Sequence, residues 1–328
     1  MTTSINPSDV RARVGIDALN QPGTVARRSI GGCEAFEIAS LDLSCMVVPE
    51  RGGRIVSLRD RTRDHEWMWA PGPRDRLPAR PVGSDFASGP LVGADECLPS
   101  VGACAVGGLS IPDHGEIWAR PWTVDPGDLE HGVLTTRVAL DCMPFELERS
   151  ILLDGPSCHL SYRLRNLSGD ALPWLWSWHP LMVLPENARL ELSPRPREIR
   201  VESGEGVPQG AVGPWPSPFE GACLDRLELG AETASGKLFC GGIERAVLTD
   251  LAVGSALEIT ADPAVLSGMG LWINRGGWNG YRHVAIEPTN VPVETLGEAA
   301  QLNGHASIPG GGERRWSLRL RAVAAALD

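Results

Sequence analysis

The sequence predicts an all-β protein, a sandwich or a barrel, because short apolar or alternating runs recur along the whole chain and helical patterns are rare. Gly, Pro, Asp and Asn separate the runs, and the 38 Gly and 27 Pro residues would interrupt long helices almost everywhere. Short helices are expected only at 7–19 and 293–302. The clearest expected strands are 45–49, 54–58, 133–140, 146–153, 159–164, 188–192, 257–260, 269–273, 284–286 and 316–320.

The turn chemistry indicates antiparallel pairing of neighbouring runs. Three Gly-containing turns suit hairpins: Arg51-Gly52-Gly53, Asp154-Gly155-Pro156 and Ser168-Gly169-Asp170. Two irregular loops, 71–93 and 203–220, have the length that is typical of functional lids or mobile segments. Because the chain shows no internal repeat and no linker, we expect one domain over 1–328, with 1–25 as a peripheral N-terminal segment.

The charge balance excludes two classes of partner. A net charge of −11 disfavours nucleic acid and anionic membrane surfaces, which both need clustered cations. The basic residues are almost all arginine, and Lys237 is the only lysine. We attribute this bias to genomic base composition, and it leaves no second lysine for Schiff-base chemistry.

The chain reads as a cytoplasmic protein. No apolar run approaches the ~20 residues that span a bilayer, and residues 1–20 lack the apolar stretch of a signal peptide. The eight cysteines show no Cys-x-x-Cys pair, so we expect free thiols rather than a zinc site or a disulfide framework.

Three segments place titratable side chains among aromatic ones: 111–122, 174–181 and 272–289. Most of the 11 tryptophans lie in them, and a broad apolar face with one N–H donor suits a pyranose ring. Filling a β core is the plain alternative for any one tryptophan. Because alternate residues of a strand share a face, the tryptophans at 174, 176 and 178 should lie on one face and His179 on the other.

His179 and Glu287 are the strongest candidates for chemistry. His179 ends the tryptophan-rich run and precedes Pro180, which favours an extended backbone that can present a ring nitrogen to a ligand. Glu287 follows the apolar run 284–286, where a carboxylate is costly unless it has a partner or a role. The plain alternatives are a structural core histidine and a structural ion pair between Glu287 and a nearby arginine. Among the other histidines, only His283 is a further candidate, because it is close to Glu287 in sequence.

These segments resemble, in the same order, those of the aldose 1-epimerase (galactose mutarotase-like) superfamily. The likeness rests on 51–58, on the His-Gly segment 113–118, on Trp178-His179-Pro180-Leu181, on Ile286-Glu287-Pro288, and on 308–318. The resemblance implies a large antiparallel β-sandwich and interconversion of the anomers of a free sugar, with no cofactor and no metal. It implies Glu287 as the base that takes the O1 proton, His179 as the acid that protonates O5, and His114 as a hydrogen-bonding group.

The expected substrate contacts come from the same segments and from a stretch that departs from the family pattern. Where galactose mutarotases carry an arginine, this chain has Asp95 and Glu96, which leaves the identity of the sugar open. Arg120 resembles an arginine of hexose-6-phosphate epimerases, but Glu116 lies close to it, and a carboxylate next to a phosphate would be unfavourable. The expected substrate-binding residues are Asp95, Glu96, Glu116, Arg120, Trp176, Trp178, Trp272 and Asn274.

Other functions remain open at this point. The same fold could serve a non-catalytic carbohydrate-binding protein or a hexose-phosphate epimerase. A glycosidase or lyase could use paired carboxylates such as Glu116 and Glu287, if they lay ~5–9.5 Å apart. A metal enzyme built on His114, His179 and Glu287 is the least favoured. The expected partner is a small carbohydrate, and a homodimer is left open.

Overall fold

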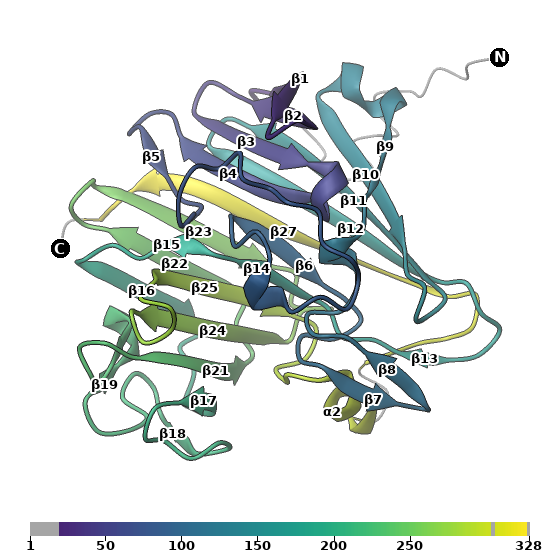
Figure 1. Ribbon diagram of the computed structural model, residues 1–328. Coiled ribbons are helices and arrows are strands. Elements are labelled where there is room, and N and C mark those ends of the chain that lie inside the picture. The colour runs from purple at the N-terminus through teal and green to yellow at the C-terminus, as the bar shows by residue number, and fades with distance from the viewer. Residues whose placement is uncertain (1–19, 303–305, 327–328) are drawn as a thin grey trace.

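The computed structural model, which describes residues 20–302 and 306–326, is a sandwich of two large antiparallel sheets (Figure 1). Within these residues the larger sheet has 13 strands and the smaller has eight. The larger runs in the order β1 (Thr24–Ile30), β2 (Cys33–Ala39), β3 (Leu43–Val48), β4 (Arg54–Asp60), β6 (Ala94–Cys97), β14 (Ser177–Pro180), β25 (Arg282–Thr289), β24 (Gly268–Arg275), β21 (Ser235–Gly241), β17 (Glu198–Gly204) and β18 (Val212–Pro214), with β5 (His65–Glu66) on β4 and β15 (Met182–Val183) on β25. The smaller runs in the order β16 (Ala188–Ser193), β22 (Arg245–Asp250), β23 (Ser255–Ala261), β27 (Glu313–Ala324), β12 (Ser157–Asn166), β11 (Phe145–Asp154), β10 (Val133–Ala139) and β9 (Thr123–Asp125).

Short elements surround the two sheets. Three two-stranded ribbons pair β7 (Cys104–Val106) with β8 (Leu109–Ile111), β13 (Leu172–Pro173) with β26 (Ser307–Ile308), and β19 (Ala222–Cys223) with β20 (Glu228–Leu229), among the described residues. The helix α2 (Leu296–Gln301) begins at a capping box of Thr295 and Glu298. None of the helices in the described part of the chain is long and apolar enough to cross a membrane.

The predicted all-β fold is confirmed, and the two stacked sheets make it a sandwich rather than a barrel. Each of the ten expected strands lies in an observed strand, although 45–49 and 133–140 each run one residue too far. The helix expected at 293–302 is confirmed over a shorter length, and the one expected at 7–19 lies outside the described residues. Of the expected peripheral segment 1–25, Thr24 and Val25 already belong to the edge strand β1.

Two of the three expected hairpin turns are present. Gly52 and Gly53, with φ of 73° and 62°, join β3 to β4, and 154–156 joins β11 to β12. The hairpin expected at 168–170 is wrong: β12 pairs with β11 and β27, and the chain beyond it leads to β13, which pairs with β26. All eight cysteines are free thiols, as expected.

A buried ion pair crosses the core between the sheets. Glu96 of β6 and Arg149 of β11 are both fully buried, and Nη1 of Arg149 lies 2.9 Å from Oε1 of Glu96. Tyr162 donates a hydrogen bond to Oε1 of the same carboxylate at 2.9 Å, and Trp176 donates one to Oε2 at 2.8 Å. The guanidinium of Arg149 also stacks 4.6 Å from the Trp122 ring centroid. These polar groups are therefore structural parts of the core.

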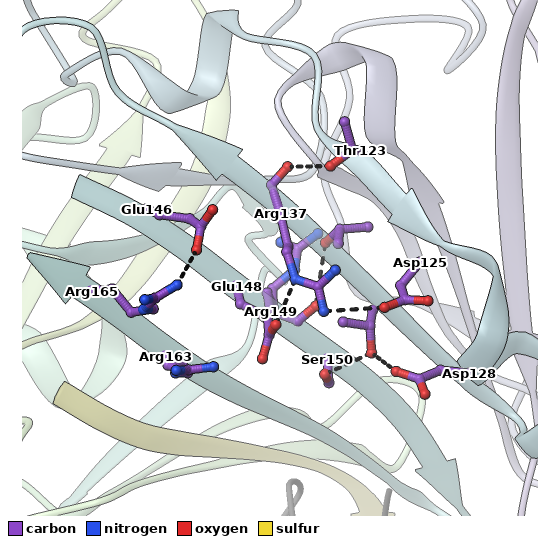
Figure 2. Close-up of polar contacts among 12 residues, drawn as sticks. Thr123, Asp125, Asp128, Arg137, Glu146, Glu148, Arg149, Ser150, Arg163 and Arg165 are labelled. Atoms are coloured by element: carbon purple, nitrogen blue, oxygen red, sulfur yellow. Dashed lines mark hydrogen bonds and ion pairs between the residues drawn. The ribbon is translucent and has the colours of Figure 1, made fainter. Parts of the chain in front are cut away.

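The face of the smaller sheet that points away from the core carries partly exposed charge pairs (Figure 2). Arg137 pairs with Glu148 at 2.6 Å and with Asp125 at 3.1 Å, while Arg165 pairs with Glu146 at 3.2 Å. Such pairs contribute little to stability because solvent screens them.

Replacing one member of the buried pair should be costly. We expect Arg149→Met to lower the free energy of unfolding by about 3–5 kcal/mol, because it leaves the Glu96 carboxylate buried without a counter-charge. Arg165→Met, which breaks an exposed pair one strand away, should cost less than about 1 kcal/mol. Urea unfolding measures both. Equal, small losses for the two variants would show that the Glu96–Arg149 pair does not hold the sheets together.

Candidate active site

A pocket of about 210 Å³ opens on the face of the larger sheet that points away from the core. This volume lies below the ~300–1,000 Å³ typical of drug-sized ligands, so it suits a small one. The walls are largely apolar, with a few titratable groups between them. The apolar side chains include Phe86, Leu91, Val101, Leu181, Trp272 and Trp278, and the titratable ones are Asp113, His114, His179, Lys237, His283 and Glu294.

Strand register assembles the floor of this pocket from segments far apart in the sequence. His179 is on β14, and the neighbouring strand β25 carries Glu287. Glu287 lies directly opposite Gly270 of the next strand, β24. Trp272 of β24 in turn lies opposite Lys237 of β21. Directly opposed residues of neighbouring strands project to the same face. At Gly270 a Cβ atom would lie 3.1 Å from Oε2 of Glu287, so glycine leaves the room that this carboxylate occupies.

Glu287, Lys237 and His179 form a chain of contacts at the floor. Glu287 is fully buried, and its Oε2 atom accepts a hydrogen bond from the Lys237 ammonium. Its Oε1 atom lies 3.6 Å from Nε2 of His179 and has no hydrogen-bond partner within the described chain. Burial, with the nearby His114 and Lys237 charges, holds the pKa of His179 well below its usual value, so its imidazole is neutral at neutral pH. His179 and Lys237 line the pocket, and Glu287 lies behind them.

His114 approaches from the loop that follows β8. Its φ of 58° places it in the left-handed region, and its backbone N–H donates to the Val101 carbonyl at 2.6 Å. The imidazole stacks on the Phe86 ring with centroids 3.7 Å apart, and its Nδ1 atom lies 3.0 Å from Oδ1 of Asp113. This contact lowers the pKa of Asp113, although burial opposes the shift. The ring of His114 lies 5.1 Å from that of His179, so both histidines face one volume.

The loop 71–93 covers one side of the pocket and contributes Phe86, Ala87 and Leu91. Arginines attach it to the sheet: Arg51 donates to the Leu77 carbonyl at 2.8 Å, and Arg54 to the carbonyls of Pro90 and Val92 at 2.5 and 3.1 Å. The second expected loop, 203–220, begins inside β17, to which the pocket residue Ser203 belongs, and it contains the short strand β18.

Solved structures with the same architecture cover nearly the whole chain. A galactose mutarotase-like protein from Clostridium acetobutylicum is 13% identical, with 92% of this chain and 99% of that chain covered and a TM-score of 0.67. A galactose mutarotase-like protein from Lactobacillus casei is 15% identical, with 88% of this chain and 100% of that chain covered and a TM-score of 0.65. An Escherichia coli protein provisionally assigned as an aldose 1-epimerase is 14% identical, with 92% of this chain and 99% of that chain covered and a TM-score of 0.64. No family model matches the sequence, and no curated protein matches it.

The chain has the galactose mutarotase-like fold. At these identities the likeness establishes the fold alone. Of the residues expected at the site, this fold brings together His114, His179 and Trp272 at the pocket, with Glu287 directly behind them.

Three of the expected substrate contacts lie on the other face of the sheet. Glu96, Trp176 and Trp178 are fully buried between the sheets of the mutarotase-like fold, where Glu96 binds Arg149 and Trp176. The tryptophans and His179 do lie on opposite faces of the sheet, as expected, but the face with the tryptophans is the one in the core. They therefore fill the β core, and none of them reaches the pocket.

The charged residues among the expected substrate contacts have structural partners. Asp95 lies beside His179 in register, but it is fully buried and pairs with Arg54 at 2.6 Å; burial raises the pKa of Asp95 to about 7 despite the arginine. Glu116 accepts the backbone N–H groups of 141 and 142, at 2.8 and 3.2 Å, and Arg120 pairs with Asp141 at 2.6 Å. Glu116 and Arg120 therefore anchor loops outside the pocket.

Asn274 organises the turn that follows β24. Its Oδ1 atom accepts the N–H groups of Gly276 and Trp278, both at 3.1 Å, and its Nδ2 donates to the Trp278 carbonyl at 3.0 Å. Asn274 thus supports the pocket indirectly, by fixing Trp278. Four pocket residues were not expected as site residues from the sequence: Lys237, Glu294, Asp113 and Phe86. Asp113 lies in the expected His-Gly segment, and Lys237 could have been found as a single lysine in an arginine-rich chain. Over residues 20–302 and 306–326, no group of three or more His, Cys, Asp or Glu side chains is arranged to hold a metal ion.

His283 should stay neutral well into the acidic range. Trp272 donates its indole N–H to Nε2 of His283 at 3.0 Å, and burial lowers the pKa of His283 to about 4. A pH titration of the histidine ring ¹⁵N shifts should therefore show His283 unprotonated at pH 6, and protonated only below about pH 4. A midpoint near 6.5, the usual histidine value, would show that this ring is not held in the dry indole contact.

Proposed function

We propose that this protein is an aldose 1-epimerase, which interconverts the α and β anomers of a free sugar. The observation that supports it most strongly is the 3.6 Å separation between Nε2 of His179 and Oε1 of Glu287 at the pocket floor. The reaction exchanges protons at O1 and O5, and these oxygens are neighbours because both are bonded to C1. A base and an acid that serve them must therefore lie close together on one side of the sugar.

The reaction needs one base and one acid. Glu287 removes the proton of the O1 hydroxyl while His179 delivers a proton to O5, and the C1–O5 bond breaks to give the open-chain aldehyde. Rotation about C1–C2 presents the other face of the carbonyl, and the reverse proton transfers close the ring. The sugar would bind beside this pair, with O1 within hydrogen-bond reach of the unpartnered Oε1 atom of Glu287 and O5 within reach of Nε2 of His179.

The surrounding residues suit this role. His114, fixed by Asp113 and Phe86, stands where it can donate a hydrogen bond to a sugar oxygen and stabilise charge developing there. The rings of Phe86, Trp272 and Trp278 offer apolar surface to the C–H groups of a pyranose. A glycosidase using Glu116 is disfavoured, because that carboxylate is bound to backbone N–H groups outside the pocket.

Substitution of the acid or the base should remove the activity. Anomer exchange, measured by saturation-transfer NMR over a panel of free aldoses, should be accelerated by the protein for at least one sugar. Glu287→Gln and His179→Ala should each reduce that acceleration about 10²–10⁴-fold. Circular dichroism and the melting temperature serve as folding controls, because the amide oxygen introduced by Glu287→Gln can still accept a hydrogen bond from Lys237. Bound sugar without any acceleration in the wild type would instead indicate a carbohydrate-binding protein.

The rate should rise as the pH falls. Because the pKa of His179 lies well below its usual value, the imidazolium that protonates O5 is a minority species at neutral pH. Lowering the pH from 8 to 6 should enlarge that fraction, and with it the protein-catalysed rate, by up to about tenfold per pH unit. A rate that increases with pH over this range would contradict the assignment of His179 as the acid.

A further inference from the structure

Lys237 is a titratable group at the pocket floor that the mechanism above leaves without a task. It is the only lysine of the sequence, and arginine occupies every other basic position. Base composition explains why lysine is rare, but it does not explain why the single lysine lies in the pocket, with 6% of its surface exposed. A compact ammonium group differs from a planar guanidinium in size and in the directions of its donors.

The contacts of Lys237 connect the floor of the pocket to one wall. Its Nζ atom donates to Oε2 of Glu287 and lies 5.3 Å from the centroid of the Phe239 ring. Glu294, which lines the pocket, has an Oε2 atom with no hydrogen-bond partner among the residues described. Glu287 and Glu294 together hold the pKa of Lys237 above its usual value although burial opposes this, so the group is an ammonium at neutral pH.

The geometry fixes what this ammonium can do. An ammonium has three N–H donors, and Glu287 accepts one of them. Because its Oε2 atom is held in this way, the other oxygen of Glu287, Oε1, is left facing His179. Lys237 itself lines the cavity, so its remaining donors are available to a ligand there.

We propose that Lys237 is a positioning and substrate-binding residue: it orients Glu287 toward His179 and donates a hydrogen bond to a hydroxyl of the sugar, with Glu294 as an acceptor for a neighbouring hydroxyl. This inference rests on the proposed function. An ammonium beside a carboxylate offers a donor and an acceptor at one place, which matches the paired donors and acceptors of vicinal hydroxyls.

The same charges define the class of sugar. Glu287 and Glu294 already balance Lys237, Asp113 adds a further carboxylate, and none of the described residues lining the pocket is an arginine. A phosphate or a carboxylate on the sugar would therefore meet uncompensated negative charge. The substrate is therefore an uncharged aldose, and phosphorylated sugars and uronic acids bind more weakly.

The test compares Lys237→Met and Lys237→Arg with the wild type, using binding and anomer exchange of D-glucose and D-galactose. Lys237→Met should weaken the binding of the sugar about 10-fold or more, since a hydrogen bond to a charged group is lost, and should also lower kcat. Lys237→Arg should not restore kcat, although it keeps the charge. Glucose 6-phosphate and glucuronic acid should bind the wild type at least about 10-fold more weakly than the neutral sugars.

Arg200→Met is the matched control. Arg200 lies on the neighbouring strand β17, pairs with Glu202 at 2.6 Å and stacks on the same Phe239 ring at 5.3 Å, but it does not line the pocket. This variant should leave binding and exchange unchanged. A loss of stability alone, with KM and kcat retained in folded Lys237→Met, would overturn the inference, and so would tighter binding of the charged sugars.

The two proposals fail in different ways. If the wild type exchanges anomers and Lys237→Met does so equally well, the role of Lys237 is refuted and the epimerase function stands. If the wild type binds neutral sugars without exchanging them and Lys237→Met loses that binding, the epimerase function is refuted and the recognition of the sugar by Lys237 stands.

Discussion

The two-residue alternation of side chains along three adjacent strands determines which side chains form the core and which form the pocket. On β6, β14 and β25 one set of side chains enters the core between the sheets and the other set faces the loops that cover the pocket. His179 and Glu287 belong to the pocket face, whereas Glu96 and Trp178 belong to the core. A shift of one residue in register would exchange the two sets and remove both the core and the site.

The Glu96–Arg149 pair in the core and the Glu287–Lys237 pair on the pocket face differ in what remains free. In the core, Arg149, Tyr162 and Trp176 hold both oxygens of Glu96, so that carboxylate is satisfied and inert. On the pocket face, Lys237 holds only one oxygen of Glu287, and the other faces His179 at 3.6 Å without a hydrogen bond. An unpaired oxygen on a fully buried carboxylate is costly, and the one on Glu287 faces a histidine that lines the pocket, where a ligand can supply the missing hydrogen bond.

The sequence predicted the fold well, because the apolar alternation and the Gly-rich turns are local signals that the sandwich preserves. It also singled out His114, His179 and Glu287, whose neighbours in sequence carry recognisable motifs. Alternation separated Trp176 and Trp178 from His179 correctly, but it could not say which face was the core. The partners of Asp95 and Glu116, which are Arg54 and the backbone at 141–142, come from tertiary contacts that no local pattern shows. Asn274 instead bonds the turn that directly follows it. Lys237 lies on β21 and Glu294 lies in the chain that follows β25. Both line the pocket, but neither belongs to a motif.

The central claim is that a sugar binds with C1 facing both the acid and the base. A crystal structure of the protein with D-glucose or D-galactose tests it most directly. The account predicts O1 and O5 within hydrogen-bond distance of Glu287 Oε1 and His179 Nε2, with one hydroxyl on Nζ of Lys237. A sugar bound in the pocket with C1 turned away from His179 and Glu287, or bound only elsewhere on the surface, would contradict it.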